Sequence, residues 1–168
     1  MKKYLKLQNI IAALGIVCIL LYFCPSFSIY QPSSEGGSSL GTVNLFIATF
    51  GGAIPNSATY SNARLVTCAG LLLAFIFTIV AIAFCVSKIK FKFGSLIACP
   101  FFITSGILLF CALPMLRFTN YNRGLSESFQ LGLYGWSIAI GVIFCVLGVL
   151  CLIDTMMTFA KPKVQEVY

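Results

Sequence analysis

The sequence predicts an all-α integral membrane protein, a bundle of four transmembrane helices with a small extracellular β element in the first outer loop. Composition is the first reason, because 60% of the 168 residues are hydrophobic and only 9% are charged, whereas about a quarter of the residues of a soluble domain are charged. The second reason is the presence of long charge-free stretches, and the third is the uneven distribution of the lysines along the chain. Residues 1–168 are therefore interpreted as one membrane domain.

Four stretches of the chain carry no charge, and each is long enough to cross a bilayer. They cover residues 7–34, 65–87, 93–116 and 128–153, and about 20 apolar residues suffice to cross about 30 Å of hydrocarbon. Lipid offers an open backbone no hydrogen-bond partner, so these spans are expected to be helices. We place them at residues 7–29, 64–86, 94–116 and 131–153. The first span is longer than the usual signal-peptide core of about 7 to 15 residues and is expected to be retained.

The lysines indicate which side of the membrane each segment faces. All eight lie at the chain ends or in the short middle loop, on one side of the predicted spans: Lys2, Lys3, Lys6, Lys88, Lys90, Lys92, Lys161 and Lys163. The positive-inside rule then places both termini in the cytoplasm. The net charge of +7 comes from short clusters suited to anionic lipid, which makes the lipid bilayer a partner and excludes nucleic acid. The expected location is the plasma membrane.

The two outer loops, residues 31–63 and 117–130, differ in length and character. The first begins with a segment rich in serine and glycine and then turns apolar over residues 42–50, where β-branched and aromatic side chains end at two glycines. This pattern predicts a strand that lies over the helix ends. A short interfacial or re-entrant helix is the alternative, because periodicity does not separate the two in so short a run.

Small residues recur at spacings of three and four in two of the predicted spans. Lipid tails are as apolar as leucine, so membrane helices associate where small side chains let their backbones approach. The packing candidates are Gly70 and Ala74 in the second span and Gly141 and Gly148 in the fourth. We interpret them as packing positions within the bundle, and a seam between copies in a homo-oligomer is the alternative.

The cysteine pattern argues against a metal site or a redox motif. The chain has eight cysteines but no C-x-x-C pair, and it has no histidine to complete a mixed zinc site. No cofactor or metal is expected. Cys85 and Cys151 lie near the predicted inner edge of the membrane, where cysteines are candidates for palmitoylation. Plain packing is the alternative for both.

Asp154 is the only acid near a predicted span, and an ionisable group inside a bilayer is by default a functional hypothesis. Counting about 20 residues inward from the interfacial Tyr134 and Trp136 puts Asp154 at the cytoplasmic boundary. There we expect it to face water and Lys161 rather than to relay protons. With so few ionisable groups, the chain is not expected to be an enzyme.

Several short segments resemble the claudin superfamily, which includes peripheral myelin proteins, epithelial membrane proteins and calcium-channel gamma subunits. The family signature is Gly or Asn, then Leu-Trp, then two cysteines, and the similar run here is Asn44-Leu45-Phe46-Ile47-Ala48-Thr49. Phe46 stands at the tryptophan position and Thr49 at the first cysteine. The family's Ala-Arg-Ala-Leu entry to the second span is similar to Ala63-Arg64-Leu65-Val66, and its entry to the fourth is similar to Gly132-Leu133-Tyr134-Gly135-Trp136.

The resemblance implies a protein that acts through protein–protein contacts. Its role would be cell–cell adhesion or a barrier, or that of an accessory subunit of a channel or other membrane complex. Its partner would be another membrane protein or a second copy. The outer-loop contact candidates are Asn44, Leu45, Phe46, Arg64, Tyr134 and Trp136. Neither outer loop contains the family's cysteine pair, so the loops must be held by packing alone.

Two other functions remain open. The first is a small integral membrane accessory protein unrelated to claudins. The second is a membrane enzyme or carrier, for which four-span precedents use an intramembrane thiol pair, an aspartate pair or a glutamate. The sequence shows none of these devices.

Overall fold

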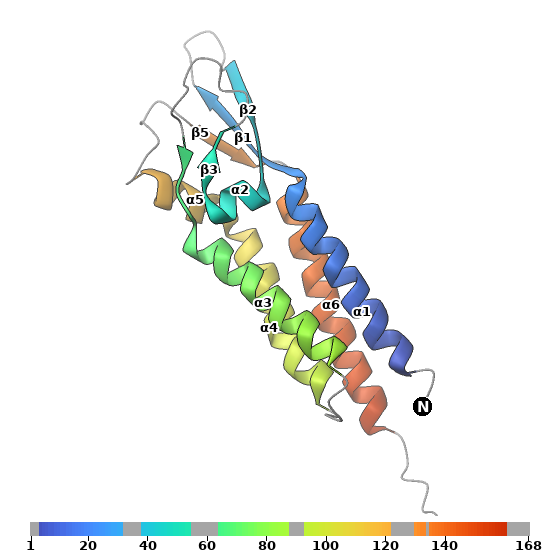
Figure 1. The fold of residues 1–168 in the computed structure, drawn as a ribbon. Helices are drawn as coiled ribbons and strands as arrows, with labels where there is room; N and C mark the ends of the chain where they lie inside the picture. Colours follow the sequence, from blue (N-terminus) through green and yellow to red (C-terminus); the bar gives the residue numbers. More distant parts are fainter. Residues whose placement is uncertain are drawn as a thin grey trace, which may run out of the picture.

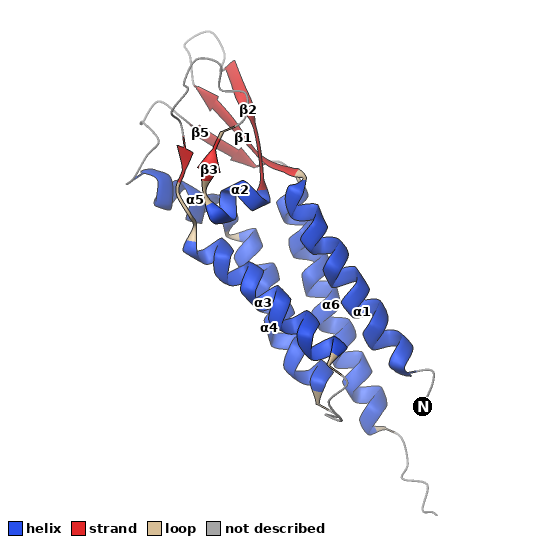
Figure 2. Ribbon diagram, in the orientation of Figure 1, coloured by secondary structure: helices blue, strands red, loops and turns tan. Residues whose placement is uncertain are grey.

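Four long helices run side by side and carry a small β layer at one end (Figures 1 and 2). The computed structural model describes residues 4–31, 38–54, 64–87, 93–121, 130–133 and 135–160. The long helices are α1 (Tyr4–Leu20), α3 (Ala69–Val86), α4 (Gly94–Phe110) and α6 (Trp136–Phe159). α3 packs on α4, α4 packs on α6, and α1 packs on both α3 and α6. Each helix therefore has two long neighbours.

The two ends of the bundle differ in structure. At one end, here called the sheet end, the chain forms strands and short helices; at the other, here called the terminal end, α1 begins and α6 finishes (Figure 1). α3 also ends and α4 also begins at the terminal end. The predicted loop lysines Lys88, Lys90 and Lys92 lie outside the described residues, as do Lys161 and Lys163.

On α3, large apolar side chains cover the outside of the bundle, and mostly smaller ones face its interior. On α3 the buried residues recur every three or four positions: Leu71, Ala74, Thr78, Ala81 and Cys85. Leu73, Ile76 and Ile79 are more than 40% exposed on the same helix. Contiguous exposed apolar surface of this kind marks a face that meets lipid or another protein.

The length and composition of the helices are compatible with membrane association. Of the described helices, α3 and α6 are each long and apolar enough to cross a membrane. α4 is followed by α5 (Ala112–Tyr121) after a bend of 59°, and this pair is a third candidate if it forms one span. The apolar segment Leu7–Phe23 is shorter.

The predicted spans of residues 7–29, 64–86, 94–116 and 131–153 extend too far toward the sheet end. Helix α1 gives way to a 3-10 turn, η1 (Leu21–Phe23), and then to strand β1 (Pro25–Gln31). Strand β4 (Arg64–Leu65) precedes α3, strand β5 (Gln130–Leu133) precedes α6, and the third span breaks between Phe110 and Ala112. Absence of charge does not distinguish an apolar strand from an apolar helix, which explains these errors.

The β layer combines part of the first predicted outer loop with the sheet-end parts of the first and fourth predicted spans. A three-stranded antiparallel sheet has the order β2-β1-β5, with β2 spanning Ser38–Asn44. Phe27 at the centre of β1 pairs with Val43 on β2 and with Leu133 on β5. β3 (Gly52–Ala53) pairs with β4 in a second small sheet. The sequence predicted a β element in the first loop only, so β1, which begins within the predicted first span, and β5, which lies almost entirely within the predicted fourth span, are additions.

The apolar run of residues 42–50 divides into a strand and a helix. β2 ends at Asn44, and α2 covers Leu45–Phe50. The strand prediction is wrong for the second half, where the alternative of a short helix holds. Asn44 decides this change, because its side chain accepts a hydrogen bond from the Ile47 amide at 2.8 Å and caps the helix. Gly51, with φ of 78°, ends α2 in a conformation that favours glycine.

Glycines bring α4 and α6 into backbone contact. A Cβ atom on Gly141 would lie 3.2 Å from the Gly106 carbonyl oxygen, and a Cβ on Gly106 would lie 2.8 Å from the Gly141 carbonyl oxygen. Gly148 faces Ile103 of α4 in the same way. The structure thus places both α6 candidates against a neighbouring helix of the same chain, as packing within the bundle requires.

We predict that Gly141→Leu prevents correct packing of α4 on α6. The new side chain has no space between the two backbones, so the free energy of unfolding should fall by about 3 kcal/mol or more. Thermal unfolding of the detergent-purified protein measures this loss. Gly135→Leu is the control, because nothing lies within 4 Å of a Cβ at Gly135. A stably folded Gly141→Leu protein with only an altered cross-linking pattern in membranes would instead support a homo-oligomer seam.

Candidate functional site

Contacts between aromatic rings hold the short helix α2 against η1, which follows α1, and against the sheet-end part of α3. Phe46 stacks on Phe23 with ring centroids 4.9 Å apart and touches Phe50 at 4.7 Å. Phe50 meets Phe75 of α3 edge-on at 5.3 Å, and Phe75 meets Tyr22 at the same distance. Each such pair contributes about 0.5–1.5 kcal/mol beyond the burial of its area. Phe46 therefore sits in a ring cluster between α1, α2 and α3.

Hydrogen bonds join the remaining parts of the sheet end. The buried Asn120 side chain of α5 accepts from the Val66 amide at 3.0 Å and donates to the Leu116 carbonyl at 2.9 Å. Arg117 of α5 donates to the Leu131 carbonyl of β5 at 2.8 Å. Thr67 donates to the Phe50 carbonyl at 2.8 Å. These bonds link α5, β5, α2 and the segment before α3 into one layer.

The predicted contact residues divide into those that build this layer and those that face outward. Asn44 caps α2, Leu45 is fully buried and Phe46 is half-buried. Arg64 on β4 is exposed, and Trp136 at the start of α6 is 42% exposed. Tyr134 lies outside the described residues. Arg64 and Trp136 are therefore the described candidates that a partner can reach.

Sequence reasoning missed the structural roles of Arg117 and Asn120. Both lie on α5, which the third predicted span partly covered and which the structure turns away from α4 by 59°. A charged residue followed by an asparagine directly after an apolar stretch was the available signal. The partners of both side chains are more than ten residues away in the sequence, so the signal did not identify them.

At the terminal end, three helices contribute to a buried polar cluster. Asp154 of α6 is 1% exposed, and its Oδ2 accepts hydrogen bonds from Ser95 Oγ of α4 at 2.5 Å and from Gln8 Nε2 of α1 at 3.1 Å. Gln8 Nε2 also donates to Ser95 Oγ at 3.0 Å. The cluster therefore ties α1, α4 and α6 together. Asp154 Oδ1 is buried without a hydrogen-bond partner.

The expectation that Asp154 faces water is wrong, because its side chain is buried. Its expected neighbour Lys161 lies outside the described residues. Counting residues along α6 gave an approximate depth but not the face of the helix. Leu147, Cys151 and Asp154 are separated by successive spacings of four and three, on the stripe that faces the bundle. This helical spacing was the signal that could have predicted the burial.

Two thiols lie beside this cluster. Cys85 of α3 and Cys151 of α6 are 5% and 0% exposed, and their side chains lie close enough to interact with each other. Both thiols thus lie in the interior of the bundle, as the alternative of plain packing requires, and palmitoylation at these positions stays a prediction. The structure also brings together two cysteines that are 66 positions apart in the sequence, a pairing that no local motif signals. Within the described residues, no group of three or more His, Cys, Asp or Glu side chains could hold a metal.

The other two packing candidates also face elements of the same chain. A Cβ on Gly70 would collide with the Met115 side chain of α5. Ala74 is fully buried, and its carbonyl accepts a hydrogen bond from Ser105 Oγ of α4 at 3.0 Å. Both positions thus let α3 approach its neighbours closely.

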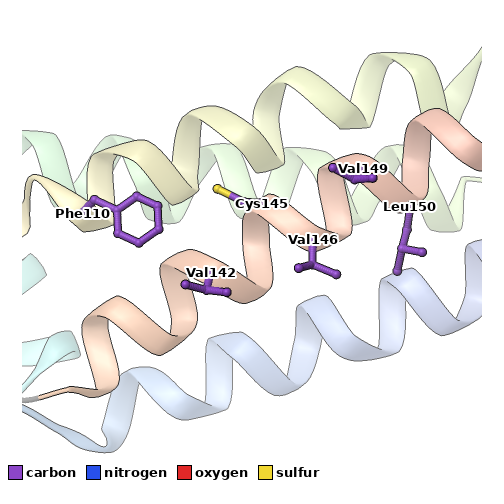
Figure 3. Close-up of a pocket in the computed structure, with 6 residues that line it drawn as sticks. All are labelled: Phe110, Val142, Cys145, Val146, Val149 and Leu150. Carbon is purple, nitrogen blue, oxygen red and sulfur yellow. The ribbon is translucent and has the colours of Figure 1, made fainter.

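An apolar groove of about 340 Å³ runs along one side of α6 (Figure 3). Its lining residues are Phe110, Val142, Cys145, Val146, Val149 and Leu150. None of these side chains carries a charge or a strong hydrogen-bonding group, so the groove cannot orient a polar ligand.

Comparison with known proteins adds no assignment. No protein-family model matches the chain, and no curated protein matches it.

We predict that Asn44→Ala destabilises the sheet end while Asn44→Asp does not. Alanine removes the side-chain acceptor that caps α2, which typically costs about 1 kcal/mol, whereas aspartate retains an acceptor. Chemical denaturation of the two variants in detergent measures the difference. Equal losses in both variants would show that the cap does not stabilise this layer.

Proposed function

We propose that the protein is a claudin-like tetraspan of the plasma membrane that acts through protein–protein contacts of its outer layer. In this proposal α1, α3, α4 with α5, and α6 each cross the bilayer. The sheet end is then extracellular, and both termini are cytoplasmic. The lysine distribution supports this orientation, because every predicted lysine segment leaves the bundle at the terminal end.

The membrane span proposed for α1 is supported by its surface. Ile10, Ile16, Val17 and Leu20 are 48–62% exposed, which is costly in water over so long a helix and favourable in lipid. The segment Leu7–Phe23 is about 25 Å long at 1.5 Å per residue. That length is close to the hydrocarbon thickness of about 30 Å, which thinning of the bilayer can match.

The observation that carries the proposal is the pairing of β5 with β1. This pairing joins the strand that follows α1 to the strand that precedes α6, so one sheet connects the start of the first outer loop to the end of the second on the same side of the molecule. A binding surface that combines two loops on a rigid scaffold is a frequent arrangement for recognition. The layer resembles a contact module more than a catalytic site.

The missing loop cysteines are compatible with this proposal, because other interactions hold the layer. Thr49, at the position of the first family cysteine, is fully buried, and its carbonyl accepts a hydrogen bond from the Cys68 amide at 3.2 Å. The ring cluster around Phe46 and the hydrogen bonds of Asn120 connect the same segments.

We predict that Arg64→Glu and Trp136→Ala weaken association with the partner and leave the protein folded. Exposed arginine and tryptophan are the residue types that most often dominate binding energy, and their loss typically weakens binding by about tenfold or more. Co-purification from mild detergent measures the association. Met156→Ala is the matched control, because Met156 is 68% exposed at the terminal end. Normal co-purification of both variants would contradict the proposed surface.

The same co-purification distinguishes the two roles within this class. A stoichiometric channel or transporter partner supports an accessory subunit. Association between copies in separate membranes supports adhesion, and vesicles carrying the purified protein should then aggregate. If neither result is obtained, the unrelated accessory protein becomes the better hypothesis.

We predict that a tag inserted in the first outer loop, between residues 31 and 63, is accessible from outside intact cells. A tag between residues 88 and 92 should become accessible only after the membrane is permeabilised. The physical reason is the retention of lysine clusters in the cytoplasm. Exposure of the second tag on intact cells would contradict four spans with this orientation.

A further inference from the structure

Only one of the two carboxylate oxygens of Asp154 accepts hydrogen bonds. Both hydrogen bonds from Ser95 and Gln8 reach Oδ2, whereas Oδ1 is buried and accepts none. The two donors therefore satisfy one carboxyl oxygen and leave the other without a partner. The remaining charge density then resides on an oxygen that nothing in the described structure neutralises.

The described cationic side chains do not compensate this charge. Arg64 and Arg117 both belong to the sheet end, while Asp154 lies near the terminal end of α6. The groups around Asp154 are the neutral Gln8 and Ser95, together with the thiols of Cys85 and Cys151, which are close enough to interact with it electrostatically. Cys99 lies close to Cys151 in the same region. An isolated buried carboxylate is strongly unfavourable unless a positive charge joins it.

We propose that Asp154 Oδ1 is the binding site for one unhydrated monovalent cation, either a proton or a sodium ion. Oδ1 is too enclosed to be reached by water, which excludes a hydrated ion. A proton would form an O–H bond at Oδ1, and a sodium ion would be held by the hard oxygen Oδ1 itself, since Ser95 Oγ and Gln8 Nε2 both bind Oδ2. Both occupants place one positive charge on the same atom, so they share one site.

Occupancy of this site would control how firmly the terminal end is closed. Asp154, Ser95 and Gln8 come from α6, α4 and α1 respectively. Loss of the cation would leave an unbalanced charge between these helices and favour their separation, which admits water. The site therefore makes the docking of α1 sensitive to the cation at the terminal face of the protein.

The sequence allows a direct test, because Asp154 is the only aspartate in the chain. Protein labelled with carboxyl-¹³C aspartate gives infrared and NMR signals from this one side chain. A protonated-acid signal that converts to carboxylate as the pH rises supports the proton. A carboxylate signal that changes when sodium chloride replaces choline chloride at constant ionic strength supports the sodium ion. A carboxylate signal that is unchanged by both treatments would overturn the proposal.

Thermal unfolding of the full-length protein in lipid nanodiscs provides the second measurement. When the cation concentration exceeds the dissociation constant, each further tenfold increase in that concentration should shift the folding equilibrium about tenfold toward the folded state. Asp154→Asn removes the charge while keeping the shape and should abolish this dependence. An equal response of wild-type protein and Asp154→Asn to pH and to sodium would contradict the site. If Asp154→Asn does not fold, the labelled wild-type protein still decides the question.

Discussion

The close approach of α4 and α6 is the constraint on which the rest of the structure depends. Gly106 and Gly141 place the two backbones in contact, and Gly148 extends this contact toward the terminal end. Inside a bilayer no hydrophobic driving force brings helices together, so dispersion contacts at short range must do so. Once α4 and α6 are paired, α3 and α1 complete the bundle around them. Many large apolar side chains are left on the outer surface, while others, such as Phe102 and Phe144, fill the interior.

The bundle has a different stabilising chemistry at each end. At the sheet end, aromatic rings and backbone-directed hydrogen bonds hold a layer made from two loops. This arrangement replaces the disulfide that the family resemblance would imply. At the terminal end, Gln8, Ser95 and Asp154 join three helices through side chains alone. Polar bonds of this kind fix the rotation of each helix, which apolar packing leaves weakly specified.

The two ends also divide the proposed activities. The contact layer carries the exposed Arg64 and Trp136, whereas the buried polar cluster around Asp154 lies near the terminal end. Since α1 and α6 run between the two ends (Figure 1), a change in helix docking at the Asp154 site would reach the sheet through β1 and β5. β1 follows α1 through the 3-10 turn η1, and β5 precedes α6. The two strands pair with each other.

The sequence by itself determined the location of the apolar helices, the presence of an ordered element in residues 42–50 and the small residues at the packing positions. These features depend on composition and local spacing, which a single chain displays directly. Tertiary structure alone decided the pairing of β5 with β1, the division of residues 42–50 at Asn44, the burial of Asp154 and the meeting of Cys85 with Cys151. Each of these depends on groups that are distant in the chain or on the rotation of a helix, and neither is set by hydropathy. Counting residues indicates how far along a helix a residue lies, whereas only packing determines which side of the helix faces its neighbours.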